Sequence, residues 1–199
     1  MNNAGYGLFG AAEEFTAAQI DAIVATNLSG SIPLIRAVLP YIREAGRGRV
    51  VQLSSYGGQV AFPGNSMYYA TKWGLGGFCE SAAQEVAPFG IGVTIVEPGG
   101  VRTEFRYGSV QTADPLAEYE GNPAHACRAM LDPAQRPGPR RPRPHGDADH
   151  RERRPGPRTP AHGPRLQALT STIDTLERHL ADFRTQDTLA ASTDFPQGE

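Results

Sequence analysis

The sequence predicts an α/β fold with a parallel sheet, because short apolar strands alternate with long helices. Residues 49–54 and 91–96 are Val- and Ile-rich runs that end at turn residues, as expected for strands covered on both faces. Residues 66–87 form a long helical segment between them, and residues 16–45 form another before them. This order of helices and strands is typical of a layered α/β domain.

Composition restricts the class of protein. The chain has 199 residues, a formal net charge of -2 and a pI near 6.2, so no nucleic-acid or membrane-surface partner is expected. Cys79 and Cys127 follow no metal-ligand spacing, so we expect two reduced thiols in a cytoplasmic protein and no metal site. No continuous apolar run approaches the roughly 18 to 20 residues of a membrane helix, so we expect no membrane span.

Residues 5–10 spell GYGLFG, which matches the G-x-G-x-x-G pattern of dinucleotide-binding loops. That pattern requires a preceding strand and a helix that opens at the third glycine. The helix signal comes later, at Thr16 and Gln19, which form a plausible capping box. We therefore interpret GYGLFG as a loop that follows residues 2–5, NNAG.

The first helix is expected from Thr16 to about Ala45, with a kink at Pro33 where the apolar period has a gap. Asn27 lies within it. An asparagine in the middle of a helix needs a reason, such as a hydrogen bond of its side chain.

Three side chains predict the chemistry. Tyr68 and Lys72 are four residues apart, so on a helix they share a face, where the ammonium is expected to lower the phenol pKa. Ser55 follows the strand 49–54, at the edge where open α/β sheets bind ligands. Such a group suits proton exchange with an alcohol or a carbonyl. A Tyr/Lys pair at this spacing is also common on solvated helix faces.

Further residues carry a family resemblance. NNAG, Asn27, Ser55, the Tyr68-x-x-x-Lys72 pair and the run from Pro98 to Thr103, taken in this order, resemble the classical short-chain dehydrogenase/reductase family. The resemblance covers residues 1 to about 127 and, more weakly, 165–199. It implies the C-terminal part of a Rossmann-like, doubly wound parallel sheet. The first βαβαβ segment of that fold, with the family's phosphate-binding TGxxxGxG motif, has no counterpart in this sequence.

The resemblance also implies the site. Hydride would pass between NAD or NADP and a small-molecule carbonyl or secondary alcohol. Tyr68 would be the general acid/base, Lys72 would lower its pKa and hold the nicotinamide ribose, Ser55 would bind the substrate oxygen, and Asn27 would order a relay water. The residues implied for the cofactor are Asn3, Ala4, Gly5, Tyr68, Lys72, Pro98, Gly99, Val101 and Thr103. The stretch from 104 to about 130 would cover the substrate, with Phe105, Tyr107, Leu116 and Tyr119 suggesting an aromatic-lined pocket.

Helix 66–87 is apolar on more than one face, with Trp73, Leu75, Phe78 and Val86, which is typical of a buried helix. By resemblance it would pack against a second copy, in a homodimer or homotetramer. Burial within one subunit is the alternative.

Composition divides the chain into three parts: an incomplete catalytic core at 1–132, a segment at 133–164, and an amphipathic helix with a tail at 165–199. Residues 133–165 contain nine arginines, three acidic residues and no Val, Ile, Leu, Met, Phe, Tyr or Trp, so we expect disorder. One hypothesis is a reading frame lost near Arg128 and regained near Arg165, together with a start assigned inside a longer gene. Resequencing the gene and its upstream DNA tests it. A basic binding arm is the other interpretation.

Three functions therefore stay open: an NAD(P)-dependent oxidoreductase, an inactive remnant that only dimerises, and an interaction protein that uses the basic segment.

Overall fold

The computed structural model describes residues 1–99, 105–129, 131 and 164–185. The predictions for Val101, Thr103 and the segment 133–163 concern positions outside these residues. The helices are α1 (Ala17–Val24), α2 (Ser31–Glu44), α3 (Ser66–Val86), α4 (Phe105–Gly108), α5 (Pro123–Ala129) and α6 (Pro164–Thr185), and the strands are β1 (Gly7–Phe9), β2 (Gly48–Leu53), β3 (Ile91–Val96) and β4 (Val110–Thr112).

The strands confirm a parallel α/β arrangement. β2 and β3 pair in parallel over their whole length, from Gly48 opposite Ile91 to Leu53 opposite Val96. The N-terminal segment runs along the other edge of β2, where Asn2 bridges Gln52. β2 and β3 end at the same level, and the Ser54 amide donates to the Val96 carbonyl at 2.8 Å. Both chain segments that follow these strands therefore leave the sheet at one edge.

A second parallel pair was not predicted. Within GYGLFG, β1 pairs with β4, about 100 residues later. No helix opens at Gly10, so the interpretation as a false cofactor motif holds, but the segment is partly a strand rather than a loop. The close pairing suits glycine at position 7, because a Cβ there would lie 3.1 Å from Val110 Cγ2.

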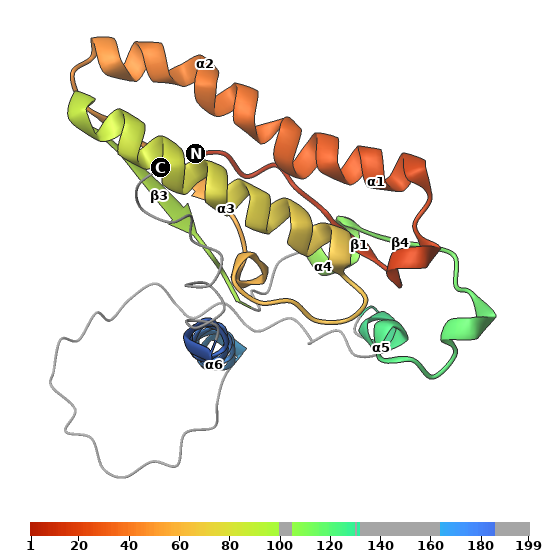
Figure 1. The fold of residues 1–199 in the computed structure, drawn as a ribbon. Coiled ribbons are helices and arrows are strands. Elements are labelled where there is room, and N and C mark those ends of the chain that lie inside the picture. Colours follow the sequence, from red (N-terminus) through yellow and green to blue (C-terminus); the bar gives the residue numbers. More distant parts are fainter. Residues whose placement is uncertain (100–104, 130, 132–163, 186–199) are drawn as a thin grey trace, which may run out of the picture.

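α1 and α2 follow one another end to end, and α3 runs beside them over the strands (Figure 1). The predicted capping box is present: Thr16 Oγ1 accepts from the Gln19 amide at 3.2 Å, and Gln19 Oε1 accepts from the Thr16 amide at 3.0 Å. Two core clusters form under these helices. Leu8, Phe15, Ile23 and Ala113 make one, and Ile35, Val50, Leu75 and Cys79 make the other.

The predicted kink was placed wrongly. The helix is interrupted by a π-helical turn, Ala25–Ser29, in which the Gly30 amide donates to the Ala25 carbonyl at 2.7 Å. Pro33 stands in the first turn of α2, four residues after the π turn ends at Ser29. The interruption instead surrounds Asn27, and π turns inside helices are frequent at functional sites.

Ala17–Glu44, taken as one helical segment of 28 residues, is long and apolar enough to cross a membrane by length and composition. The expectation from the sequence that no such segment exists was therefore wrong on this measure. Core helices pass the same test, and Ile23, Asn27 and Ile35 of this segment are buried under its neighbours.

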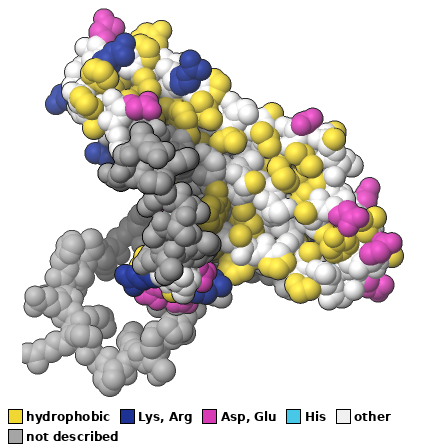
Figure 2. All heavy atoms as spheres, in the orientation of Figure 1, with side chains coloured by type: hydrophobic (Ala, Val, Ile, Leu, Met, Phe, Trp, Pro, Cys, Tyr) yellow, Lys and Arg dark blue, Asp and Glu magenta, His cyan; other side chains and the backbone are white. Residues whose placement is uncertain are grey.

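Apolar side chains remain on the surface of two helical regions. α3 buries one face only, and Trp73 is 43% exposed, so it is not enclosed on all sides within one chain. Figure 2 shows hydrophobic side chains spread over the neighbouring helical face. The predicted amphipathic C-terminal helix is present as α6, but it packs through Ala168 and Thr175. Its apolar stripe is exposed: Leu169, Ile173, Leu176, Leu180 and Phe183.

Candidate active site

Ser55 leaves the end of β2 in an extended conformation, with φ -160° and ψ 157°. Its hydroxyl accepts a hydrogen bond from the Gly57 amide at 3.1 Å, which fixes the side chain at the start of the next turn. That turn lies against α3, because a Cβ at position 57 would stand 2.7 Å from the Tyr69 ring. Only glycine permits this approach, so the local sequence holds Ser55 beside the first turn of α3.

Tyr68 and Lys72 lie on the same face of α3, as predicted. Lys72 Nζ is 5.6 Å from the centroid of the Tyr68 ring. The lysine is 5% exposed, and its Nζ donates to the Leu53 carbonyl at 3.4 Å. Tyr68 is half-buried and makes a hydrogen bond with the Ser55 side chain. The structure therefore brings Ser55, Tyr68 and Lys72 together at the end of β2.

The electrostatics differ from the prediction. Burial raises the pKa of the Tyr68 phenol, and its hydrogen bond with Ser55 acts in the opposite direction without reversing this. Burial also lowers the pKa of Lys72 to about 8. The phenol pKa is therefore raised in this structure, and not lowered as the spacing of Tyr68 and Lys72 had predicted. The ammonium lies over the ring and bonds to a backbone carbonyl, so desolvation decides the direction for both groups.

Asn27 is fully buried and connects three segments. Its Oδ1 accepts from the Tyr6 amide at 2.9 Å, and its Nδ2 donates to the Tyr6 carbonyl at 2.8 Å and to Thr71 Oγ1 at 3.3 Å. Thr71 Oγ1 in turn donates to the Tyr68 carbonyl at 2.8 Å. The side chain thus holds the turn after NNAG against α3, within one residue of Lys72. This explains why an asparagine stands in the middle of a helix.

The predicted cofactor residues are only partly gathered. Gly5 lies next to Asn27 and Lys72, because a Cβ there would be 3.2 Å from Asn27 Oδ1 and 3.5 Å from Lys72 Nζ. Asn3 and Ala4 are exposed, on the chain that leads to Gly5. The Pro98 carbonyl accepts from the Tyr56 amide at 3.1 Å, which places the turn after β3 beside the turn after Ser55, and Gly99 follows half-buried.

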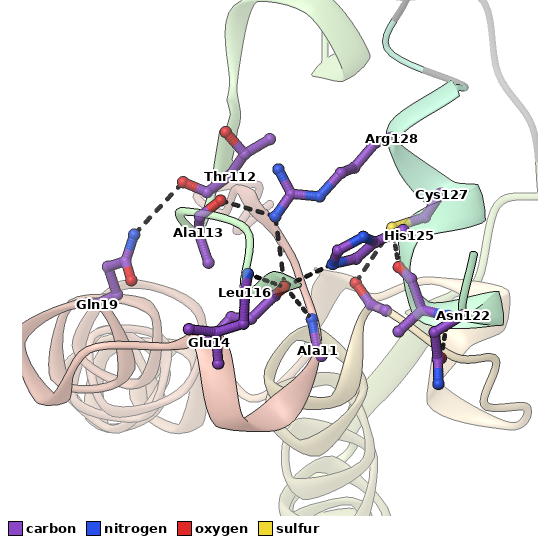
Figure 3. Close-up of polar contacts among 12 residues, drawn as sticks. Ala11, Glu14, Gln19, Thr112, Ala113, Leu116, Asn122, His125, Cys127 and Arg128 are labelled. Carbon is purple, nitrogen blue, oxygen red and sulfur yellow. Dashed lines mark hydrogen bonds and ion pairs between the residues drawn. The ribbon is translucent and has the colours of Figure 1, made fainter. Parts of the chain in front are cut away.

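Two features were missed. Thr71 links Asn27 to α3, and its only signal in the sequence is its position between Tyr68 and Lys72. The other is a buried Glu14 bound by residues 100 and more positions away, for which the sequence offers no signal (Figure 3). Among the predicted pocket residues, Phe105 lies beside Tyr68, with ring centroids 6.2 Å apart. The Tyr119 hydroxyl instead donates to Glu13 at 3.1 Å, and Leu116 is 38% exposed.

Comparisons with known proteins agree with this arrangement. The family model described as short chain dehydrogenase matches residues 1–114. Oxidoreductase BOA17 of Botryotinia fuckeliana is 42% identical over 120 residues, which cover 60% of this chain and 44% of that protein. Human retinol dehydrogenase 8 is 37% identical over 139 residues, 68% of this chain and 44% of that protein. The chain thus spans less than half the length of these curated relatives.

Solved structures give the same result. A short-chain dehydrogenase from Streptomyces avermitilis matches with a TM-score of 0.71 and 32% identity, over 97% of this chain and 70% of that one. ElxO with NADP bound matches with a TM-score of 0.50 and 32% identity, over 52% of this chain and 42% of that one.

Proposed function

The chain belongs to the short-chain dehydrogenase family. We propose that it acts as an NAD(P)-dependent oxidoreductase that interconverts a carbonyl and a secondary alcohol. The observation that carries the proposal is the convergence of Ser55, Tyr68 and Lys72 at the end of β2, with a hydrogen bond between Ser55 and Tyr68. A phenol and a hydroxyl at this position can bind one substrate oxygen together.

The described residues fit the nicotinamide end of such a cofactor. The backbone of Gly5 lies close to Asn27 and Lys72, since a Cβ there would stand 3.2 Å from Asn27 Oδ1 and 3.5 Å from Lys72 Nζ. Lys72 Nζ has three donor hydrogens, and its hydrogen bond to the Leu53 carbonyl is long, so it can also bind ribose hydroxyls. Among the described residues, Ser54 Oγ is a buried polar atom without a hydrogen-bond partner at the same edge of the sheet. A polar ligand here would satisfy it.

The chain's own residues would then divide the work. A bound nicotinamide supplies or accepts the hydride. Ser55 positions the substrate oxygen, and Tyr68 donates its proton to that oxygen during reduction and takes it back during oxidation. Lys72 holds the ribose and places positive charge beside the phenol at neutral pH. Asn27 keeps the Gly5 turn and α3 in register, which fixes the distance between cofactor and base.

Calorimetric titration of the 199-residue chain with NADH and with NADPH tests the proposal. Saturable binding to one of them, lost in Lys72→Met and retained in Tyr68→Phe, is the expected result. Tyr68→Phe should lower carbonyl reduction about 100-fold or more, since general acid/base catalysis contributes roughly that much. Absence of binding to either nucleotide would exclude an oxidoreductase role for this chain.

A second proposal is self-association, which would also serve a chain without catalytic activity. α2 exposes Leu34, Val38 and Tyr41 along one side. Apolar side chains at this helical spacing suit a homodimer or homotetramer. Light scattering on the purified chain should give twice or four times the monomer mass, and Val38→Glu should give the monomer. A wild-type monomer at high concentration would contradict this.

A further inference from the structure

The carboxylate of Glu14 is fully buried and its two oxygens are bound by four donors (Figure 3). Oε2 accepts from the Ala11 amide at 2.7 Å and from Arg128 Nη2 at 3.3 Å. Oε1 accepts from the Leu116 amide at 2.9 Å and pairs with His125 Nε2 at 2.5 Å. A buried charge is retained at low cost only when it is paired and hydrogen-bonded in this way.

Three of these donors belong to a distant part of the chain. Leu116, His125 and Arg128 all come from residues 105–128, which we call the covering segment. Arg128 also donates to the Ala113 carbonyl at 2.8 Å, so one side chain ties two points of this segment to the same carboxylate. Together with the pairing of β4 and β1, Glu14 therefore fastens the covering segment to the N-terminal region.

The covering segment reaches the catalytic group at its other end. β4 pairs with β1, and the Gly7 amide donates to the Ser109 carbonyl at 3.1 Å. Phe105, at the start of the segment, lies against the Tyr68 ring. A shift of the segment would therefore move the aromatic side chain that stands beside the predicted general acid/base.

We propose that Glu14 is a positioning residue that fixes the covering segment, so that Phe105 forms a wall of the substrate site beside Tyr68. The location of that wall rests on the proposed function, whereas the fastening does not. Glu14 touches neither substrate nor cofactor, so its effect on the reaction passes through the covering segment. It should change how tightly the substrate is held rather than how fast it reacts.

Hydrogen exchange of backbone amides tests the fastening without any activity. Glu14→Gln keeps the shape of the side chain but replaces one acceptor oxygen by an NH₂ group. This group is itself a donor, so it cannot accept the hydrogen bonds that the carboxylate oxygen accepts in the wild type. The Leu116 amide and the amides of residues 113–128 should exchange about 10-fold faster or more, whereas those of α3 should change less than about twofold. Glu13→Gln is the matched control. Glu13 is exposed and accepts a hydrogen bond from the Tyr119 hydroxyl, which a glutamine oxygen can also accept, so exchange should stay within about twofold.

His125→Gln supplies a second variant, because it removes one of the four donors. If Glu14→Gln unfolds the whole chain, so that α3 also loses protection, His125→Gln should still give the local increase at a smaller size. The proposal is overturned if Glu14→Gln folds and the amides of residues 113–128 exchange at the wild-type rate. If Glu14→Gln unfolds, the same result in His125→Gln overturns it.

Kinetics then test the link to the reaction. Glu14→Gln should raise KM for a carbonyl substrate about 10-fold and leave kcat and the calorimetric NADPH affinity within about threefold. A fall in kcat with unchanged KM would overturn the positioning role. If the wild-type chain binds no nucleotide, the proposed function fails, while the exchange experiment still decides whether Glu14 fastens the segment.

Discussion

Lys72 is the only lysine in the sequence, and this allows a direct test of the electrostatics of the site. Burial lowers the pKa of Lys72 from 10.5 to about 8. At 1.36 kcal/mol per pH unit, this difference corresponds to about 3 kcal/mol of folding free energy. Lys72 binds a proton less readily in the folded state than in the unfolded state. Its burial therefore lowers the free energy of unfolding in full below pH 8, and this destabilisation disappears as pH rises from 8 to 10.5.

Lys72→Met removes the buried charge and keeps most of the side-chain volume. The free energy of unfolding at pH 7 should rise by as much as about 3 kcal/mol, measured by urea denaturation. The gain over wild type should shrink toward zero near pH 10. Lys72→Arg is the matched control, because arginine keeps its charge at every pH tested. The free energy of unfolding of this variant should therefore not recover between pH 8 and 10 as that of the wild type does.

The same lysine can be observed by NMR. Selective ¹³C labelling of lysine gives one side-chain signal, because the sequence has a single residue of this type. Its titration midpoint should lie near 8. A midpoint near 10.5, or a Lys72→Met variant that is less stable than wild type at pH 7, would refute the conclusion that the ammonium is held in a desolvated site.

Three further outcomes are expected. Gly64→Ala should destabilise the chain by about 2 to 4 kcal/mol in urea denaturation, because Gly64 has φ +85° and a Cβ would lie 2.3 Å from the Ala124 carbonyl oxygen. Gly46→Ala, also at positive φ but with nothing within 4 Å, should cost only about 1 kcal/mol, and equal costs would contradict the packing of α5 on this turn. Glu14 has its pKa lowered to about 2, so its contribution to stability is present above pH 4.5 and is lost as pH falls toward 2. An acid unfolding curve that Glu14→Gln leaves unchanged would contradict this.

The sequence alone determined much of the framework. The periods of apolar residues located α3, β2 and β3 to within about two residues, and they predicted an amphipathic helix within 165–199, where α6 lies. The spacing of Tyr68 and Lys72 placed both on one helix face, and the strand before Ser55 placed it at the edge of the sheet. These are local relations, which the geometry of a helix or a strand fixes without reference to the rest of the chain.

Tertiary structure decided the rest. Asn27, in the π turn, makes hydrogen bonds to Tyr6 and Thr71, which no local pattern encodes. The pairing of β1 with β4 and the burial of Glu14 join residues about 100 positions apart, so neither has a periodic signal. The pKa directions at Tyr68 and Lys72 were decided by burial, which is a property of the packed chain. The four-residue spacing established that the two groups are neighbours, whereas desolvation determined which of their protonation states the fold favours.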